Sequence, residues 1–337
     1  MFRFAALCVA FSALLQTGAA YAQAVTARVG YIPVLGTAQI FVADKEGMLK
    51  KAGIEPRFAV FESGPAMISA LASGTLDIYV GGVAPLAVAR SKGVDVKVVA
   101  ATAINEMTVV AGSKLAPLFK EGVAPAQALR AFRDANGGKP ARFATQPPGS
   151  VPHTTLVHWL DQAIKADKSD YEVITMGIDA TQQALLAGAV DGSTLREPAV
   201  TVSLRRDPRL KIVATGEDMF PRQPGTVVAV SGAFLEKNRD AVQKLVDGVV
   251  AATQIIETDP ARAAGPLEVA LGKGLLDTDT LVKAIKSPAS NFASDPRLIV
   301  DSFRAMQAYQ VKIGSLDKEY PLDGLFDPSF YEKAVGR

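Results

Sequence analysis

Three short turns combine small residues with a proline, and their chemistry suits the binding of an anion. They are Ser63-Gly64-Pro65, Gly81-Gly82-Val83-Ala84-Pro85 and Gly149-Ser150-Val151-Pro152. Proline is favoured at the first position of a helix because its missing N–H group would have no partner there. The next backbone N–H groups also lack partners within the helix, and small residues let a ligand approach them. Such a start attracts an anionic group, although small residues before a proline also begin ordinary helices.

An arginine and a glutamate supply the charges of a fourth turn. Arg196 and Glu197 follow a predicted strand and precede Pro198. A guanidinium can bind a carboxylate, sulfonate or phosphate through two parallel hydrogen bonds. Glu197 could accept a hydrogen bond from an amine or hold Arg196 in place. The alternative is a surface ion pair that contributes little.

Two more side chains near these turns are candidates for ligand contact. His153 follows the third turn, and Phe61 ends a predicted strand, where it could form a wall of a cleft or pack in the core. The two histidines, His153 and His158, are five residues apart and have no glutamate between them, unlike the pair in zinc proteases. We find no nucleophile–base pair and no metal-binding motif. The sequence therefore predicts no catalytic residue, no metal and no cofactor.

Alternating strands and helices must position these turns. The pattern predicts strands over 25–32, 57–61, 76–80 and 96–103, and a second series over 142–145, 172–176, 190–195 and 210–214. Helices are predicted between the strands. This alternation is typical of a mainly parallel sheet with helices on both faces. Ligands bind such sheets at the carboxyl ends of the strands, which is where the turns lie.

A short phrase occurs twice and indicates a duplicated framework. Residues 70–77 and 184–191 both read as a helix end, a glycine and an aspartate that enters a strand, and they lie 114 residues apart (184 minus 70). Glycine suits a helix end because it adopts the left-handed conformation at little cost. The predicted fold class is α/β, with two doubly wound α/β lobes joined by two hinge crossings. We assign 23–112 and 227–337 to lobe 1 and 113–226 to lobe 2, with hinge bending near 109–113 and 227–231.

The composition and the first residues predict an exported protein. The 337 residues include 49% hydrophobic and 21% charged residues, with a net charge of +2 and no cluster of basic residues that would indicate a nucleic-acid partner. Arg3 is followed by an uncharged, mostly apolar run over 4–15, and then by Ala20-Tyr21-Ala22. This is the pattern of a signal peptide, and we expect cleavage after Ala22 and a periplasmic location.

The chain resembles the periplasmic solute-binding proteins of ABC importers, of the nitrate, sulfonate and taurine type. The resemblance rests on residues 41–54, 61–66 and 73–77, on Gly149-Ser150 before a helix, and on 188–191 leading to Glu197-Pro198. It implies a periplasmic-binding-protein arrangement of type II, and delivery of the solute to a membrane permease with a cytoplasmic ATPase. It also implies ligand contacts by Gln39, Ser63, Gly64, Gly82, Val83, Ala84, Ser150, Val151, His153 and Glu197.

One departure from this family bears on the ligand. Members often have a bulky aromatic residue shortly before the acidic residue and proline, whereas this chain has Ser193, Thr194, Leu195 and Arg196 there. The leading hypothesis is a monomeric binding protein for a small organic anion, either a sulfonate such as taurine or a carboxylate. A neutral heterocycle such as a pyrimidine vitamin precursor is an alternative ligand. An exported enzyme acting on the same small anions is the alternative from another class.

Overall fold

The strands of the chain form two separate five-stranded sheets. The computed structural model describes residues 24–271 and 276–336, so the predicted signal peptide and its cleavage after Ala22 lie outside the described residues. The first sheet has the order β2 (Ile54–Val60), β1 (Val25–Tyr31), β3 (Ile78–Gly82), β10 (Thr226–Ser231) and β4 (Val96–Ala101). The second has the order β7 (Tyr171–Thr175), β6 (Ala141–Thr145), β8 (Gly192–Leu195), β5 (Thr108–Ala111) and β9 (Lys211–Thr215).

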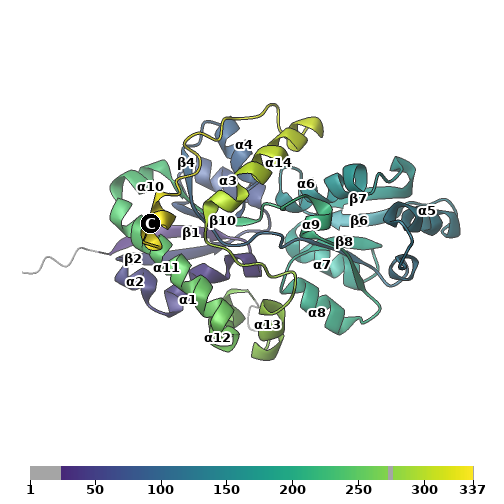
Figure 1. Cartoon of the computed structure of the whole chain (residues 1–337), viewed down its shortest axis with the longest axis horizontal. Coiled ribbons are helices and arrows are strands. Elements are labelled where there is room, and N and C mark those ends of the chain that lie inside the picture. The colour runs from purple at the N-terminus through teal and green to yellow at the C-terminus, as the bar shows by residue number, and fades with distance from the viewer. Residues whose placement is uncertain (1–23, 272–275, 337) are drawn as a thin grey trace, which may run out of the picture.

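Helices cover both sheets, and Figure 1 shows the first sheet at the left and the second at the right. The first half of the chain supplies η1 (Leu35–Thr37), α1 (Ala38–Lys45), α2 (Met48–Lys51), α3 (Gly64–Ala72) and α4 (Pro85–Ser91). The second sheet is accompanied by η2 (Ala116–Leu118), α5 (Pro125–Ala135), α6 (Val151–His158), the π-helix η3 (Trp159–Ala163), η4 (Lys168–Asp170), α7 (Ile178–Leu186), α8 (Ala199–Arg206) and α9 (Gly216–Met219). The last part forms α10 (Gly232–Lys237), α11 (Arg239–Thr258), α12 (Pro260–Ala270), α13 (Thr278–Ile285), η5 (Pro296–Ile299), α14 (Val300–Lys312) and α15 (Ser329–Ala334).

Each sheet contains one antiparallel strand, and this corrects the predicted position of the crossings. β5 pairs antiparallel with β8 and β9, so Thr108–Ala111 belongs to the second sheet, and the predicted bounds of 23–112 for lobe 1 are wrong at this point. β10 pairs antiparallel with β3 and β4 in the middle of the first sheet. The segments that pass between the sheets are therefore 102–107 and 220–225. The predicted bending positions near 109–113 and 227–231 fall largely on paired strands, whose ladder hydrogen bonds resist bending.

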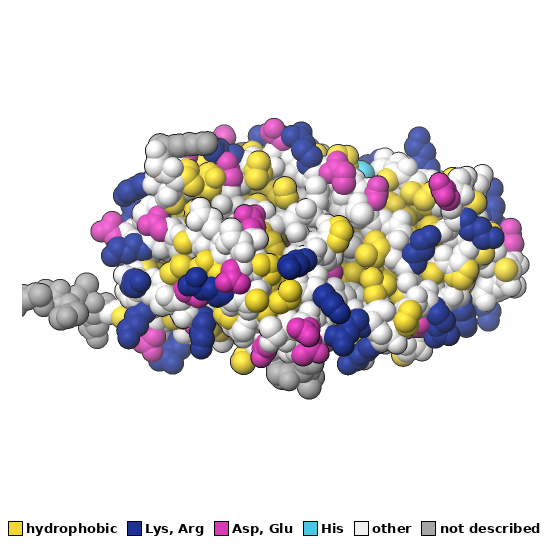
Figure 2. Space-filling model, turned by 60° about the horizontal axis from the view of Figure 1, so that its bottom comes forward, with side chains coloured by type: hydrophobic (Ala, Val, Ile, Leu, Met, Phe, Trp, Pro, Cys, Tyr) yellow, Lys and Arg dark blue, Asp and Glu magenta, His cyan; other side chains and the backbone are white. Residues whose placement is uncertain are grey.

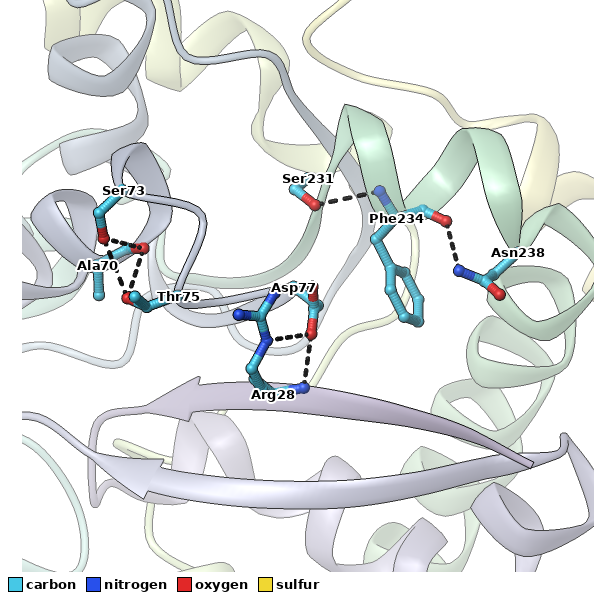
Figure 3. Close-up of polar contacts among 8 residues, drawn as sticks. All are labelled: Arg28, Ala70, Ser73, Thr75, Asp77, Ser231, Phe234 and Asn238. Atoms are coloured by element: carbon cyan, nitrogen blue, oxygen red, sulfur yellow. Dashed lines mark hydrogen bonds and ion pairs between the residues drawn. The ribbon is translucent and has the colours of Figure 1, made fainter. Parts of the chain in front are cut away.

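The internal repeat predicted from the sequence is confirmed by matching contacts in the two sheets. The backbone N–H of Arg28 donates to Asp77 Oδ2 over 2.9 Å, and the backbone N–H of Arg142 donates to Asp191 Oδ2 over the same 2.9 Å. Each aspartate returns a backbone N–H bond to its arginine's carbonyl. Figure 3 shows the first copy, in which the Arg28 side chain also reaches Asp77 beside the end of α3. The two arginines are 114 residues apart (142 minus 28), and so are the two aspartates (191 minus 77).

The C-terminal helices pack against both lobes. α11 lies against α1 in the core of the first lobe, where Val42, Leu245 and Val249 are buried together. Met306 and Tyr309 of α14 are instead part of the core of the second lobe. The region after β10 therefore also packs on lobe 2, although the prediction for 227–337 is lobe 1 alone.

Replacing Asp77 tests the importance of the repeated contact. Burial opposes ionisation of Asp77, but the hydrogen bonds and charge of Arg28 outweigh it and hold the pKa of Asp77 below its ordinary value. We expect Asp77→Ala to lower the free energy of unfolding by about 2 kcal/mol at neutral pH, since hydrogen bonds to a charged group are lost. A depressed folded-state pKa contributes stability above the unfolded-state value of about 3.9, and this contribution is lost as pH falls through the folded value.

Chemical denaturation at pH 7 and at pH 3 measures this effect. The difference in the free energy of unfolding between wild type and Asp77→Ala should be smaller at pH 3 than at pH 7. Asp191→Ala removes the equivalent carboxylate of the second lobe and is the matched variant. A gap that stayed the same at both pH values would show that the ion pair does not stabilise the fold.

Candidate functional site

The predicted turns of the two lobes meet face to face. A Cβ atom added to Gly82 would lie 2.8 Å from Cγ2 of Val151, so the second turn of lobe 1 touches the start of α6 in lobe 2. Backbone hydrogen bonds join the lobes nearby. Leu35 N–H donates to the carbonyl of Glu197 over 2.8 Å, and Ile178 N–H donates to the carbonyl of Glu62 over 3.2 Å. The structure therefore shows the lobes in contact at the strand ends.

Two of the predicted turns begin helices whose first N–H groups are capped by serine. The Ser63 hydroxyl accepts from the backbone N–H of Ala66 over 3.4 Å, and the Ser150 hydroxyl accepts from that of His153 over 3.3 Å. Both serines are buried. The backbone N–H groups of Ala66 and His153 are therefore already bonded within their own helices, although the sequence predicts that such groups are open to a ligand.

Beside this contact, residues from both lobes surround a cavity of about 220 Å³. Lobe 1 contributes Pro33 and Val34 from the loop after β1, and Leu271 and Leu276 from either side of the undescribed residues 272–275. Met107 comes from the first crossing. Lobe 2 contributes side chains from the carboxyl ends of its strands and from the helices that follow, among them Gln146, Ile178, Asp179, Gln182, Thr194, Arg196, Val202 and Arg206. The cavity has apolar walls and a few polar side chains, the usual composition of a small-molecule site.

Arg196 is the most deeply buried cation of this cavity. It directly follows β8, and its side chain is only 4% exposed. Its Nη1 atom donates to Glu106 Oε1 over 3.4 Å, which is a long contact for a pair of opposite charges. A buried guanidinium beside a cavity can bind an acidic group through its planar N–H donors.

Glu197 is not among the residues that line the cavity. Its two carboxylate oxygens accept from the backbone N–H and the hydroxyl of Thr201, each over 3.0 Å, so it caps the start of α8. Burial raises the pKa of the Glu197 carboxyl, while hydrogen bonds from Ser287 and Thr201 act in the opposite direction. In the structure Glu197 does not hold Arg196, and its contact with a ligand stays a prediction.

The other predicted residues lie around the lobe contact and do not line the 220 Å³ cavity. Val83 and Ala84 are fully buried, and Phe61 is half-buried within the first lobe's core. Gly64 packs on α4, because a Cβ atom there would lie 2.5 Å from Pro85 Cγ. Gln39 is buried and donates to the carbonyl of Thr102 over 2.7 Å.

His153 is a special case among them, because its Nδ1 atom is buried without a hydrogen-bond partner. Burial lowers the pKa of the His153 ring, which favours the neutral form. Contact between a ligand and any of these residues stays a prediction.

Sequence reasoning missed several side chains that the structure brings together. Gln146 follows β6 directly, so its position at a strand end was a usable signal. Gln182 lies within α7 and donates to the carbonyl of Ala199 over 3.3 Å, and nothing in the sequence pattern marks it. Glu106 was missed because it stands in an irregular segment without a motif.

A family model described as NMT1-like matches residues 21–270, which is more than half of the 337 residues. The chain belongs to the NMT1-like family. A relative from Brucella abortus (strain 2308), named "Putative binding protein BAB2_1146", is 25% identical over 252 residues, covering 73% of this chain and 70% of the relative. The family assignment and the solved structures that follow confirm the resemblance on which the sequence analysis relied.

Solved structures share the fold of this NMT1-like chain. The periplasmic nitrate-binding protein NrtA from Synechocystis PCC 6803 has a TM-score of 0.77 at 14% identity, covering 92% of this chain and 88% of that chain. The alkanesulfonate-binding protein SsuA from Xanthomonas axonopodis pv. citri, bound to MOPS, has a TM-score of 0.71 at 19% identity, covering 90% of this chain and 98% of that chain. Both likenesses confirm the predicted fold of two α/β lobes.

The remaining surface of the NMT1-like chain carries charges of both signs. Figure 2 shows Lys and Arg side chains interspersed with Asp and Glu on one face. Among the described residues no helix is both long and apolar enough to cross a membrane. Within the same residues no group of three or more His, Cys, Asp or Glu side chains could hold a metal ion.

The contact between Gly82 and Val151 yields a test of lobe closure. We expect Gly82→Ala to disfavour the closed arrangement, because overpacking a tight contact costs about 1–3 kcal/mol. Small-angle scattering of the purified protein should then show a larger radius of gyration than for wild type. Adding Val151→Ala to the same chain removes the colliding methyl group and should restore the wild-type value. Identical scattering from wild type and Gly82→Ala would show that this contact does not limit closure.

Proposed function

We propose that the chain is the periplasmic solute-binding component of an ABC importer, and that its ligand is a small organic anion. The observation that carries this proposal is the Arg196 guanidinium, buried at the wall of a cavity between two lobes. The similar solved structures bind nitrate and alkanesulfonates, both of which are anions. A sulfonate such as taurine, or a small carboxylate, would pair with Arg196 and place its carbon chain against Val34, Leu271 and Leu276.

The size of the cavity limits the ligand. A volume of about 220 Å³ is below the range of roughly 300–1,000 Å³ that holds drug-sized molecules. This favours a compact solute over a peptide or an oligosaccharide. The proposed cycle is binding in the cleft, closure of the lobes about the crossings 102–107 and 220–225, and delivery by a monomer to a membrane permease driven by a cytoplasmic ATPase. Such closure sequesters a solute without chemical change.

A neutral heterocycle is the second candidate ligand, and one contact favours it. Glu106 already lies 3.4 Å from Arg196, so part of the cation's charge is balanced within the protein. A ligand without charge would then accept hydrogen bonds from the remaining guanidinium donors. An exported enzyme is the alternative from another class, and product formation would distinguish it from a binder.

A ligand screen followed by one substitution tests the proposal. The protein without its signal peptide is screened with a sulfonate, a carboxylate, nitrate and a pyrimidine. The compound that binds should raise the melting temperature of the protein. For an anionic ligand we expect Arg196→Lys to weaken binding by about tenfold or more, because lysine lacks the planar fork. Isothermal titration calorimetry measures this change.

Arg209→Lys is the matched control, since Arg209 pairs with Asp207 on the exposed surface of the same lobe. The affinity of Arg209→Lys for the ligand should equal that of the wild-type protein. Unchanged affinity in Arg196→Lys would remove Arg196 from the site, and conversion of any screened compound to a product would refute the binding function.

A further inference from the structure

Glu106 is a buried carboxylate that touches both segments passing between the lobes. It stands on the first of them, 102–107, and is 3% exposed. Its Oε1 atom accepts from the hydroxyl of Thr226 over 2.5 Å. Thr226 begins β10, directly after the second segment, 220–225. One carboxylate therefore links the first segment to the strand that directly follows the second.

The same carboxylate is the hydrogen-bond partner of Arg196, but the pair is poorly formed. The single contact of 3.4 Å exceeds the roughly 2.7–2.9 Å typical of charged hydrogen bonds, and it involves one oxygen that Thr226 already occupies. The other oxygen, Oε2, is buried and has no hydrogen-bond partner. Arginine and carboxylate form their strongest pairs with two parallel hydrogen bonds, and this pair does not.

Surrounding loops, and not Arg196, orient the Glu106 carboxylate. A Cβ atom on Gly36 would lie 2.2 Å from Oε2, and one on Gly225 would lie 3.2 Å from Oε1. Glycine at position 36 lets the backbone approach the carboxylate, whereas a side chain at Gly225 would first meet the carbonyl of Ala103, 2.3 Å from an added Cβ atom. Together with Thr226, these loops hold the carboxylate in a position from which it reaches Arg196 through one oxygen only.

We propose that Glu106 is the resident counter-ion of Arg196 and competes with an acidic ligand for it. With the cavity empty, the carboxylate balances a guanidinium that is 4% exposed and that would otherwise be buried without a partner. An acidic group in the cavity takes over the guanidinium donors, and the weak contact to Glu106 is the one that yields. Glu106 is thus a positioning residue that lowers affinity for anions and links the state of the cavity to both crossings. The proposal rests on the proposed role of Arg196 at the ligand site.

Glu106→Gln tests this role with a simple anion as probe. Glutamine keeps the shape of the side chain and can still accept from Thr226, but it leaves Arg196 without a balancing charge. We expect the variant to unfold at a lower temperature than wild type, and sodium methanesulfonate to restore its stability. The half-maximal concentration of methanesulfonate should be about tenfold lower than for wild type, as expected when a competing charge is removed. Differential scanning fluorimetry in Tris buffer measures both quantities.

Two comparisons separate a charge effect from a general loss of structure. Glu121→Gln removes an exposed carboxylate from the loop before α5 and should respond to methanesulfonate as wild type does. The double variant Glu106→Gln with Arg196→Met removes both charges and should lose the response. Equal responses of Glu106→Gln and wild type, or a retained response in the double variant, would overturn the proposal.

Thr226→Val provides a second route if Glu106→Gln does not fold. It removes the hydroxyl that aims the carboxylate while nearly preserving volume, and it should shift the methanesulfonate response in the same direction by a smaller factor. Failure of the ligand screen with wild type would count against the proposed function alone. Loss of ligand affinity in Arg196→Lys together with a wild-type response in Glu106→Gln would refute only the counter-ion role.

Discussion

The buried guanidinium of Arg196 is the constraint on which the arrangement between the lobes depends. A cation removed from water requires an anion close by, and removing only one partner of such a pair is strongly destabilising. The anion here, Glu106, stands on the crossing 102–107 and not in either sheet. The contact that balances the charge of Arg196 therefore also ties the cavity to a segment that passes between the lobes. Gly36 follows from the same constraint, since a Cβ atom there would lie 2.2 Å from Oε2 and displace the carboxylate. At Gly225 the nearest obstacle is the backbone carbonyl of Ala103, 2.3 Å from an added Cβ atom.

The duplicated plan of the chain explains where this cation stands. Arg28 and Arg142, and Asp77 and Asp191, occupy equivalent places 114 residues apart (142 minus 28, 191 minus 77). The same offset pairs Gly82 with Arg196 (196 minus 82). Both residues lie at the end of a strand that follows the repeated phrase. The lobe 1 position has no side chain and closes against Val151, whereas the lobe 2 position carries a charge into the cavity. The two lobes share a framework, but at this pair of equivalent positions only lobe 2 supplies a charged group to the cavity.

The fold was largely predictable because its signals are local. Helix ends such as Gly74 and Gly188, and the alternation of strands and helices, depend on neighbouring residues only, and both glycines have positive φ angles in the structure. The sheet that contains Thr108–Ala111 was predicted wrongly, because this short apolar strand suits either sheet and its partners are distant in sequence. The position of Arg196 at a cavity wall was predictable, because it directly follows a strand. Glu106 was not, because an isolated carboxylate in an irregular segment becomes significant only when three other segments pack around it.

Contacts between the lobes bear on how much a ligand must contribute to closure. In the structure Leu35 donates to the Glu197 carbonyl, Ile178 donates to the Glu62 carbonyl, and Gly82 meets Val151, so protein groups alone make these contacts. These contacts offset part of the cost of bringing the lobes together, so a small solute need supply only the remainder. A compact anion has few atoms with which to stabilise a closed state. A protein that binds such a solute therefore benefits from lobes that already fit each other, and from a cation whose own counter-ion is held weakly enough to be displaced.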